Sequence, residues 1–167
     1  MQRIFVDANV INDIYDANRP LHQASFACLE ACLQQNLTLI TSCDLVTTIY
    51  YINSKTQGWT KALAALEQIQ TIFEIAPFSN RELSAAILLM QQDSDYSDLE
   101  DTIQYILAKT TGCELILSND AKFVAKELKV MNSLEGQGLL AQNHWLNNPP
   151  LLKRNFITKL TLTCPHP

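Results

Sequence analysis

Short apolar runs alternate with longer helix-like segments along most of this chain, and that alternation limits its possible folds more than any other feature. The runs have the length of strands, and the segments between them carry apolar residues at helical spacing. Strands separated by helices pair in parallel through right-handed crossovers. We therefore predict an α/β fold, a three-layer sandwich around a central parallel sheet of four or five strands. The expected strands are residues 3–7, 37–41, 73–76, 115–117 and 129–131.

Several of the helix-like segments begin at residues that cap helices. Ser42 precedes one segment, and Ser79 or Asn80 precedes another. Ser97, followed three residues later by Glu100, matches a capping box and predicts a helix from residue 98. The expected helices are residues 9–15, 21–35, 43–52, 59–73, 81–91, 98–110 and a short one at 120–128.

The helix–strand pattern weakens after Gly138. We expect one domain at residues 1–138, because a chain of 167 residues with 47% hydrophobic content can bury a substantial core. Residues 139–167 form a C-terminal tail, either a packing arm or an association segment, in which residues 156–163 alternate like an edge strand.

Nothing in the sequence predicts export or membrane insertion. No apolar run approaches the roughly 18 residues that a membrane-spanning helix needs. Asp7 and Asp13 interrupt any signal-peptide layout at the N-terminus. We therefore expect a cytoplasmic protein. Cys28 and Cys32 are four residues apart, so they are either half of a metal site supported by His22 or, as we favour, small buried hydrophobes of a reduced compartment.

The net charge of −5 argues against a broad basic face for nucleic acid. It does not exclude a nuclease, because bridging metal ions supply positive charge locally. It also suits a partner that carries lysine or arginine.

Three aspartates stand where α/β sheets build their sites. Asp7 ends the first expected strand, Asp120 follows the strand that ends at Leu117, and Asp101 lies early in a helical segment among core-facing positions. The three meet only if these two strands are neighbours. Converging carboxylates repel one another, so we expect at least one raised pKa and a divalent cation between them.

Each acidic residue also has a simpler explanation. Asp7 and Asp120 could cap the helices that follow them. Asp98 complements the dipole of its helix, and Glu100 is best explained by the capping box. Asp101 lies beyond the box, and an inward carboxylate there requires a cation or several donors.

Three short segments, in this order and with these gaps, resemble motifs of the PIN-domain ribonucleases, and the resemblance covers residues 1–131. The resemblance implies a metal-dependent endoribonuclease that hydrolyses RNA, often the toxin of a bacterial toxin–antitoxin pair of the VapC type. It also implies a small antitoxin as partner and a homodimer. The segments are residues 5–11 (FVDANVI), 98–104 (DLEDTIQ) and 117–123 (LSNDAKF).

Carried over residue by residue, the resemblance assigns Asp7, Asp101 and Asp120 as the carboxylates that hold Mg²⁺ or Mn²⁺. Asn9 matches the polar residue beside the first of them, and Asp98 is a candidate for holding metal through water. Such ions would assist hydrolysis of the phosphodiester.

One motif departs from the family pattern. The glutamate expected on the helix after the second strand is replaced by Thr48, which brings no charge, and Asp44 lies one turn earlier. A second function class therefore stays open, a catalytically weak or inactive PIN-like domain that binds protein or RNA. A flavodoxin-like phosphate-binding or receiver domain is disfavoured, because no glycine-rich loop follows the first strand.

Two further assignments have alternatives. Ser118 or Asn119 could bond a phosphate oxygen, although we favour a structural role in the loop. The apolar, tyrosine-bearing stretch at residues 49–52 is a candidate dimer surface, or it packs on the sheet.

Overall fold

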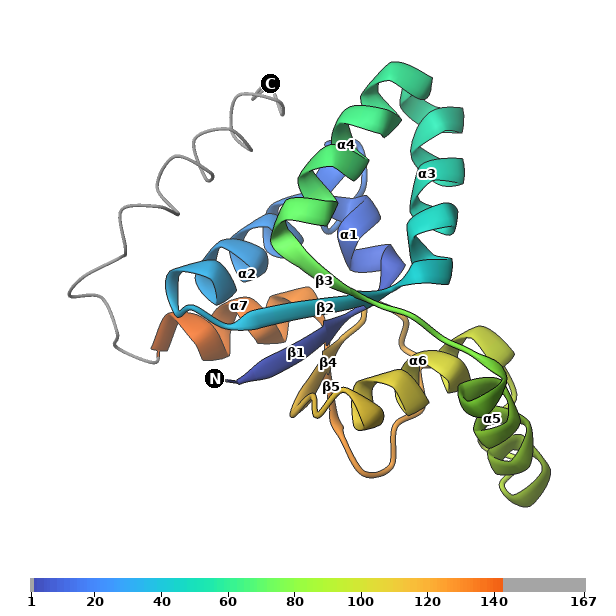
Figure 1. The fold of residues 1–167 in the computed structure, drawn as a ribbon. Coiled ribbons are helices and arrows are strands. Elements are labelled where there is room, and N and C mark those ends of the chain that lie inside the picture. Colours follow the sequence, from blue (N-terminus) through green and yellow to red (C-terminus); the bar gives the residue numbers. More distant parts are fainter. Residues whose placement is uncertain (1, 143–167) are drawn as a thin grey trace.

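A five-stranded parallel sheet in the order β3-β2-β1-β4-β5 forms the centre of the computed structural model, which describes residues 2–142 (Figure 1). β1 is the middle strand, and its Phe5 lies opposite Ile40 of β2 and Ile116 of β4. The predicted parallel sheet is confirmed, and the first strand pairs with the strand ending at Leu117, which is the condition for the three aspartates to meet. The strands are β1 (Arg3–Val6), β2 (Thr38–Ser42), β3 (Phe73–Ala76), β4 (Leu115–Leu117) and β5 (Lys129–Met131).

Helices cover both faces of this sheet (Figure 1). α2 packs against α1 and α7 on one side, and α5 packs against α6 on the other. The central strands are therefore buried on both faces, which explains their unbroken apolar sequence. The helices are α1 (Ala8–Tyr15), α2 (His22–Gln34), α3 (Cys43–Gln57), α4 (Trp59–Ile72), α5 (Asn80–Gln92), α6 (Leu99–Thr110) and α7 (Ser133–Gln142).

The start of α6 differs from the prediction. Its N-cap is Asp98, whose Oδ1 accepts the backbone N–H of Asp101 at 3.1 Å. The predicted capping box of Ser97 and Glu100 is wrong by one residue, because an aspartate at position 98 can itself cap the helix. The described residues do contain a capping box at α5, between Ser79 and Glu82.

The predicted helix at residues 120–128 is absent, and a turn takes its place. Oδ1 of Asp120 accepts the N–H of Lys122 at 2.8 Å, and the Asp120 carbonyl accepts the N–H of Phe123. An aspartate that bonds the backbone two residues later offers the chain an alternative to helix. The chain then continues to β5 without regular structure.

α7 is a helix that the sequence did not predict. It runs across residue 138 to Gln142, so the division between residues 1–138 and 139–167 stays a prediction. The backbone of Gly136 in this helix packs closely against Cys28 of α2, because a Cβ at Gly136 would lie 2.6 Å from Sγ of Cys28. The residues expected to form an edge strand, 156–163, lie outside the described part of the chain.

α3 extends beyond the predicted end at residue 52, to Gln57. Gly58, with φ of 89°, then turns the chain into α4. Ser42 occupies the N-cap position of α3 but makes no capping hydrogen bond. Ile49 is buried in the core, whereas Tyr51 is 63% exposed.

Cys28 and Cys32 are fully buried in α2, as the hydrophobic interpretation predicted. No helix within residues 2–142 is long and apolar enough to cross a membrane.

Candidate active site

The three predicted aspartates lie around one pocket. Asp7 follows β1 directly, and Asp120 lies beyond the end of β4. Because β1 and β4 are neighbouring parallel strands, their carboxyl ends share one edge of the sheet. Asp101, in the first turn of α6, faces the same space. The pocket has a volume of about 310 Å³ and is lined by Asp7, Ala8, Asn9, Asn12, Arg19, Thr48, Ile52, Asp98, Glu100, Asp101 and Asp120.

Asp7 is buried and held by two neighbours. Its Oδ2 accepts hydrogen bonds from Oγ of Ser118 at 2.7 Å and from Nδ2 of Asn9 at 2.6 Å. Burial raises the pKa of Asp7, the bond from Ser118 opposes that rise, and the charge of Asp120 adds to it. Although Asp7 stands at the N-cap position of α1, its side chain makes no capping hydrogen bond. The backbone N–H groups of Ala8 and Asn9 nevertheless lower its pKa, so the position at the start of the helix still contributes to the environment of this carboxylate.

The pKa of Asp101 is raised strongly. Partial burial, followed by the charges of Asp7, Asp98 and Asp120, raises its pKa to about 7. The expectation of a raised pKa is confirmed, with burial rather than charge repulsion as the larger cause.

Asp120 and Asp98 combine a structural bond with a place in the pocket. Asp120 is exposed, and one of its oxygens closes the turn to Lys122. Asp98 caps α6. Each carboxylate has a second oxygen, so neither bond excludes a further ligand.

The position aligned with the family's second motif does face the pocket. Thr48, on α3, is half-buried and lines it. Glu100 also lines the pocket, although the sequence pattern assigned it only to a capping box. Partial burial and the charges of Asp44 and Asp7 raise the pKa of Glu100. The negative charge of the site therefore extends beyond the three predicted aspartates.

Ser118 and Asn119 bond other parts of the protein. Oγ of Ser118 also accepts the N–H of Asp120 at 3.1 Å, and the N–H of Asn119 donates to Oδ1 of Asn9 at 3.0 Å. These contacts favour a structural role in the loop for both residues.

The carboxylates fit a divalent metal by chemistry, although they do not chelate one as they stand. Within residues 2–142, no three His, Cys, Asp or Glu side chains lie close enough together to hold an ion. Oδ1 of Asp44, near Glu100, is buried and without a hydrogen-bond partner in the same part of the chain. Oxygen donors with uncompensated charge suit hard divalent cations, and binding one requires the side chains to draw together.

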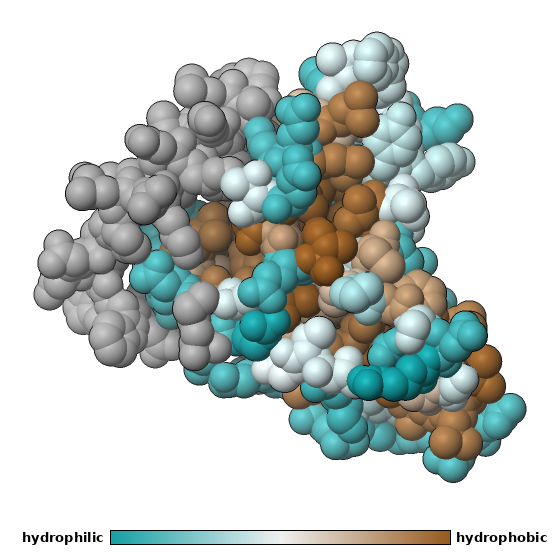
Figure 2. Space-filling view, viewed as in Figure 1, coloured by the Kyte–Doolittle hydropathy of each residue, from teal (hydrophilic) through white to brown (hydrophobic). Residues whose placement is uncertain are grey.

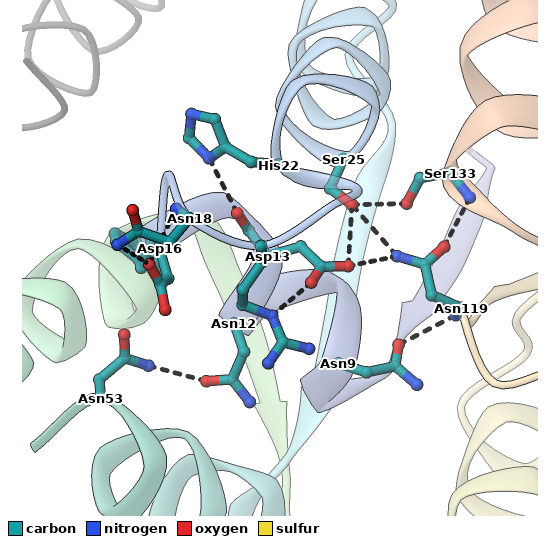
Figure 3. Close-up of polar contacts among 12 residues, drawn as sticks. Asn9, Asn12, Asp13, Asp16, Asn18, His22, Ser25, Asn53, Asn119 and Ser133 are labelled. Atoms are coloured by element: carbon teal, nitrogen blue, oxygen red, sulfur yellow. Dashed lines mark hydrogen bonds and ion pairs between the residues drawn. The ribbon is translucent and has the colours of Figure 1, made fainter. Parts of the chain in front are cut away.

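Behind the pocket lies a polar network that the sequence did not reveal (Figure 3). Its centre is Asp13, which is 3% exposed. Asp13 accepts hydrogen bonds from Nε of Arg19, from Nδ2 of Asn119 and from Oγ of Ser25. Ser25 also bonds the side chain of Ser133, at the start of α7. The network therefore ties α1, α2, α7 and the loop after β4 to one buried carboxylate.

A sequence signal for this network did exist. Asn9, Asn12 and Asp13 recur at helical spacing on α1, whose other residues are largely apolar. A polar stripe on an otherwise buried helix predicts internal hydrogen bonding.

Comparisons with known proteins agree with this geometry. A family model for the PIN domain matches residues 4–128. The chain is 44% identical over 134 residues to ribonuclease VapC1 of Aquifex aeolicus (strain VF5), covering 80% of this chain and 92% of the relative.

Two solved structures resemble the fold at lower identity. VapBC2 from Rickettsia felis, bound to a DNA fragment from its promoter, has a TM-score of 0.63 at 16% identity and covers 78% of this chain and 98% of that one. The Sarcin-Ricin loop cleaving toxin VapC20 of Mycobacterium tuberculosis has a TM-score of 0.59 at 15% identity, covering 72% and 92%. The family match and the 44% identity together show that this chain belongs to the PIN domain family.

Proposed function

We propose that this protein is a metal-dependent endoribonuclease that hydrolyses phosphodiester bonds of RNA, and that it is the toxin of a toxin–antitoxin pair. The observation that carries the proposal is the convergence of Asp7, Asp101 and Asp120 on one pocket at the carboxyl edge of the sheet. The 44% identity to a protein named ribonuclease VapC1 supports it.

PIN-domain ribonucleases generally depend on a divalent metal, and we propose Mg²⁺ or Mn²⁺ here. Asp7, Asp101 and Asp120 would hold it, with Asp98 acting through water. A bound ion would activate water and offset the charge that builds on the phosphate.

The chain's own residues orient these ligands. Ser118 and Asn9 both donate to Oδ2 of Asp7 and so fix the orientation of this carboxylate. Thr48 contributes a hydroxyl that can bond water at the position where the family resemblance predicts a glutamate. Without metal, partial burial and the neighbouring carboxylates raise the pKa of Asp101 to about 7, and a bound cation would favour its charged form.

The proposed protein partner is a small antitoxin with basic residues. The pocket is lined by five carboxylates, Asp7, Asp98, Glu100, Asp101 and Asp120. A lysine or arginine placed among them would neutralise the charge that otherwise attracts metal. Charge complementarity of this kind also speeds association.

Cleavage of RNA by the purified chain tests the proposal. We expect a pool of random single-stranded RNA to be cut when Mg²⁺ or Mn²⁺ is present and to stay intact with a chelator. Asp7→Asn keeps a similar shape but loses the charge, and we expect cleavage to fall by roughly a hundredfold or more. Glu67→Gln, at an exposed position of α4, is the control and retains activity.

The departure at Thr48 favours a second candidate, a PIN domain kept for binding. In that case the wild-type chain binds the RNA pool with or without metal and never cuts it. Cleavage that survives in Asp7→Asn would point to a contaminating nuclease and would remove the support for the proposed site.

A further inference from the structure

We propose that Arg19 forms a phosphate subsite, which binds a phosphodiester of the RNA next to the one that is cut. This inference rests on the proposed function and adds a contact to it. Arg19 lies in the loop between α1 and α2 and lines the pocket that holds Asp7, Asp101 and Asp120.

Arg19 differs in charge from the acidic residues that line the pocket. Among the described residues that line the pocket, it is the only cation, opposite five carboxylates. RNA carries a phosphate at every nucleotide, and these carboxylates repel it. A guanidinium at the rim supplies the local attraction that the acidic pocket lacks.

The buried carboxylate of Asp13 fixes the position of this guanidinium. Nε of Arg19 donates to Oδ1 of Asp13, whose side chain is 4% exposed, whereas that of Arg19 is 35% exposed. Asn119 and Ser25 hold the other oxygen of Asp13. The arginine is therefore anchored at its inner nitrogen, and its two terminal nitrogens extend the group beyond that bond.

A second pocket adjoins the first and contains a different cation. This pocket, of about 260 Å³, shares Asp98, Asp101 and Asp120 with the first and is lined by Lys122 instead of Arg19. The two cations therefore line different pockets that share these three aspartates. A single strand that crosses the site places one phosphate at Arg19 while another is held at the carboxylates.

Neutralising Asp13 is the competing role for Arg19, and substitution by lysine separates the two roles. A lysine ammonium can pair with Asp13, but it has no planar fork with which to hold a phosphate as well. Arg19→Lys therefore preserves the buried ion pair and removes the subsite. Arg19→Gln removes both, and Arg81→Gln deletes an exposed guanidinium on α5 away from either pocket.

The test measures KM and kcat for a labelled pool of random single-stranded RNA with Mn²⁺, over a series of KCl concentrations. For Arg19→Lys we expect KM to rise roughly fivefold to tenfold with kcat and Tm nearly unchanged. The slope of log KM against log salt should fall by about 0.7, the value for one phosphate contact on a single strand. Arg81→Gln should keep the wild-type slope.

Two results are decisive in the other direction. A wild-type KM and salt slope in a folded Arg19→Lys variant would overturn the phosphate subsite while leaving the nuclease intact. Absence of cleavage by the wild-type chain itself would instead overturn the proposed function. Because lysine keeps Asp13 paired, the test does not depend on whether Arg19→Gln folds.

Discussion

Asp101 owes its chemistry to neighbours that are distant in the sequence. Its raised pKa comes from burial and from the charges of Asp7, Asp98 and Asp120. The folded chain therefore binds this proton more tightly than the unfolded chain, in which the group titrates near 3.8. Stability of the metal-free protein should fall as the pH rises from 3.8 to about 7, because the unfolded state there binds fewer protons than the folded state.

Asp101→Asn should remove this dependence. The amide carries no charge, so we expect the variant to lose the fall in stability over that pH range. At pH 8 without metal its Tm should exceed that of the wild type by roughly 2–4 °C, a value discounted for the solvent that screens a half-buried group. Thermal melts in chelator between pH 4 and pH 8 measure the effect, with Glu67→Gln as control. An unchanged pH profile in Asp101→Asn would contradict the assignment.

Thr48 stands where the resemblance to PIN-domain ribonucleases predicts a glutamate, and its place in the pocket makes this difference testable. Thr48→Glu restores a carboxylate facing Asp7, which should tighten Mn²⁺ binding several-fold, since another charged oxygen donor adds Coulomb attraction. Thr47→Glu places the same charge at an exposed position of the same helix.

Calorimetric titration with Mn²⁺ compares these variants. Tighter binding in Thr48→Glu alone supports a metal site that lacks one ligand. Destabilisation of Thr48→Glu without any metal response would favour the binding domain whose chemistry was lost, because the new carboxylate would then only crowd the others.

At the scale of helices and strands, the predictions were accurate where an apolar sequence pattern determines the element. They failed where local side-chain hydrogen bonds or tertiary packing determine it. Apolar runs fixed the five strands, of which the central ones are buried on both faces, and their predicted positions agree with the structure to within one or two residues. Local side-chain bonding decided the two errors, the cap shifted to Asp98 and the turn at Asp120. α7 was missed because two glycines weaken its helical signal, and packing against α2 stabilises it instead.

Gly136 should therefore be a sensitive position of α7. A Cβ there would lie 2.6 Å from Sγ of Cys28 and 3.2 Å from Cδ2 of Leu117, both buried. Overpacking of this kind costs about 1–3 kcal/mol, so we expect Gly136→Ala to destabilise the protein in urea unfolding.

A double-mutant cycle checks the cause. Cys28→Ala removes the sulfur, so Gly136→Ala should cost less in that background. Gly138→Ala, on the same helix with nothing within 4 Å of its Cβ, should stabilise the protein by up to about 1 kcal/mol. Equal costs of Gly136→Ala in both backgrounds would show that Cys28 is not the obstacle.

At the scale of the whole molecule, hydrophobic side chains remain on the surface. Figure 2 shows such residues gathered over α4 and at α5. Large exposed hydrophobic side chains include Leu63 on α4 and Ile87 and Leu88 on α5. Two aromatic residues, Tyr51 on α3 and Trp59 at the start of α4, are more than 60% exposed. Exposed aromatic residues of this kind are enriched at protein interfaces.

We expect the protein to form a homodimer through a surface that includes Tyr51. Of the candidate stretch at residues 49–52, Ile49 is buried in the core, whereas Tyr51 is exposed and available for such a contact. Tyr51→Glu places a charge on that surface and should shift the mass measured by light scattering at tens of micromolar towards the monomer. Tyr51→Phe keeps the apolar ring and should remain dimeric. A wild-type chain with the mass of a monomer would exclude the dimer.

The parallel sheet could be predicted because strands alternate with helices along the chain, whereas the order of the strands, on which the convergence of the three aspartates depends, came only from the structure. The Asp13 network could not be predicted either, because Arg19, Ser25 and Asn119 meet only through the tertiary fold. The place of Glu100 in the pocket was not predicted. A glutamate three residues after a serine fits a capping box equally well, so the local sequence does not distinguish the two roles.

The position of β4 in the sheet has a consequence for synthesis on the ribosome. β1 is translated first, yet its partner β4 lies at Leu115–Leu117, and Ser118 and Asp120 follow it. Until those residues leave the exit tunnel, the nascent Asp7 has neither the hydroxyl that orients it nor the aspartate beside it. A growing chain of this kind carries no assembled pocket, so the ribosomal RNA that surrounds it is not exposed to the chemistry proposed for the finished protein.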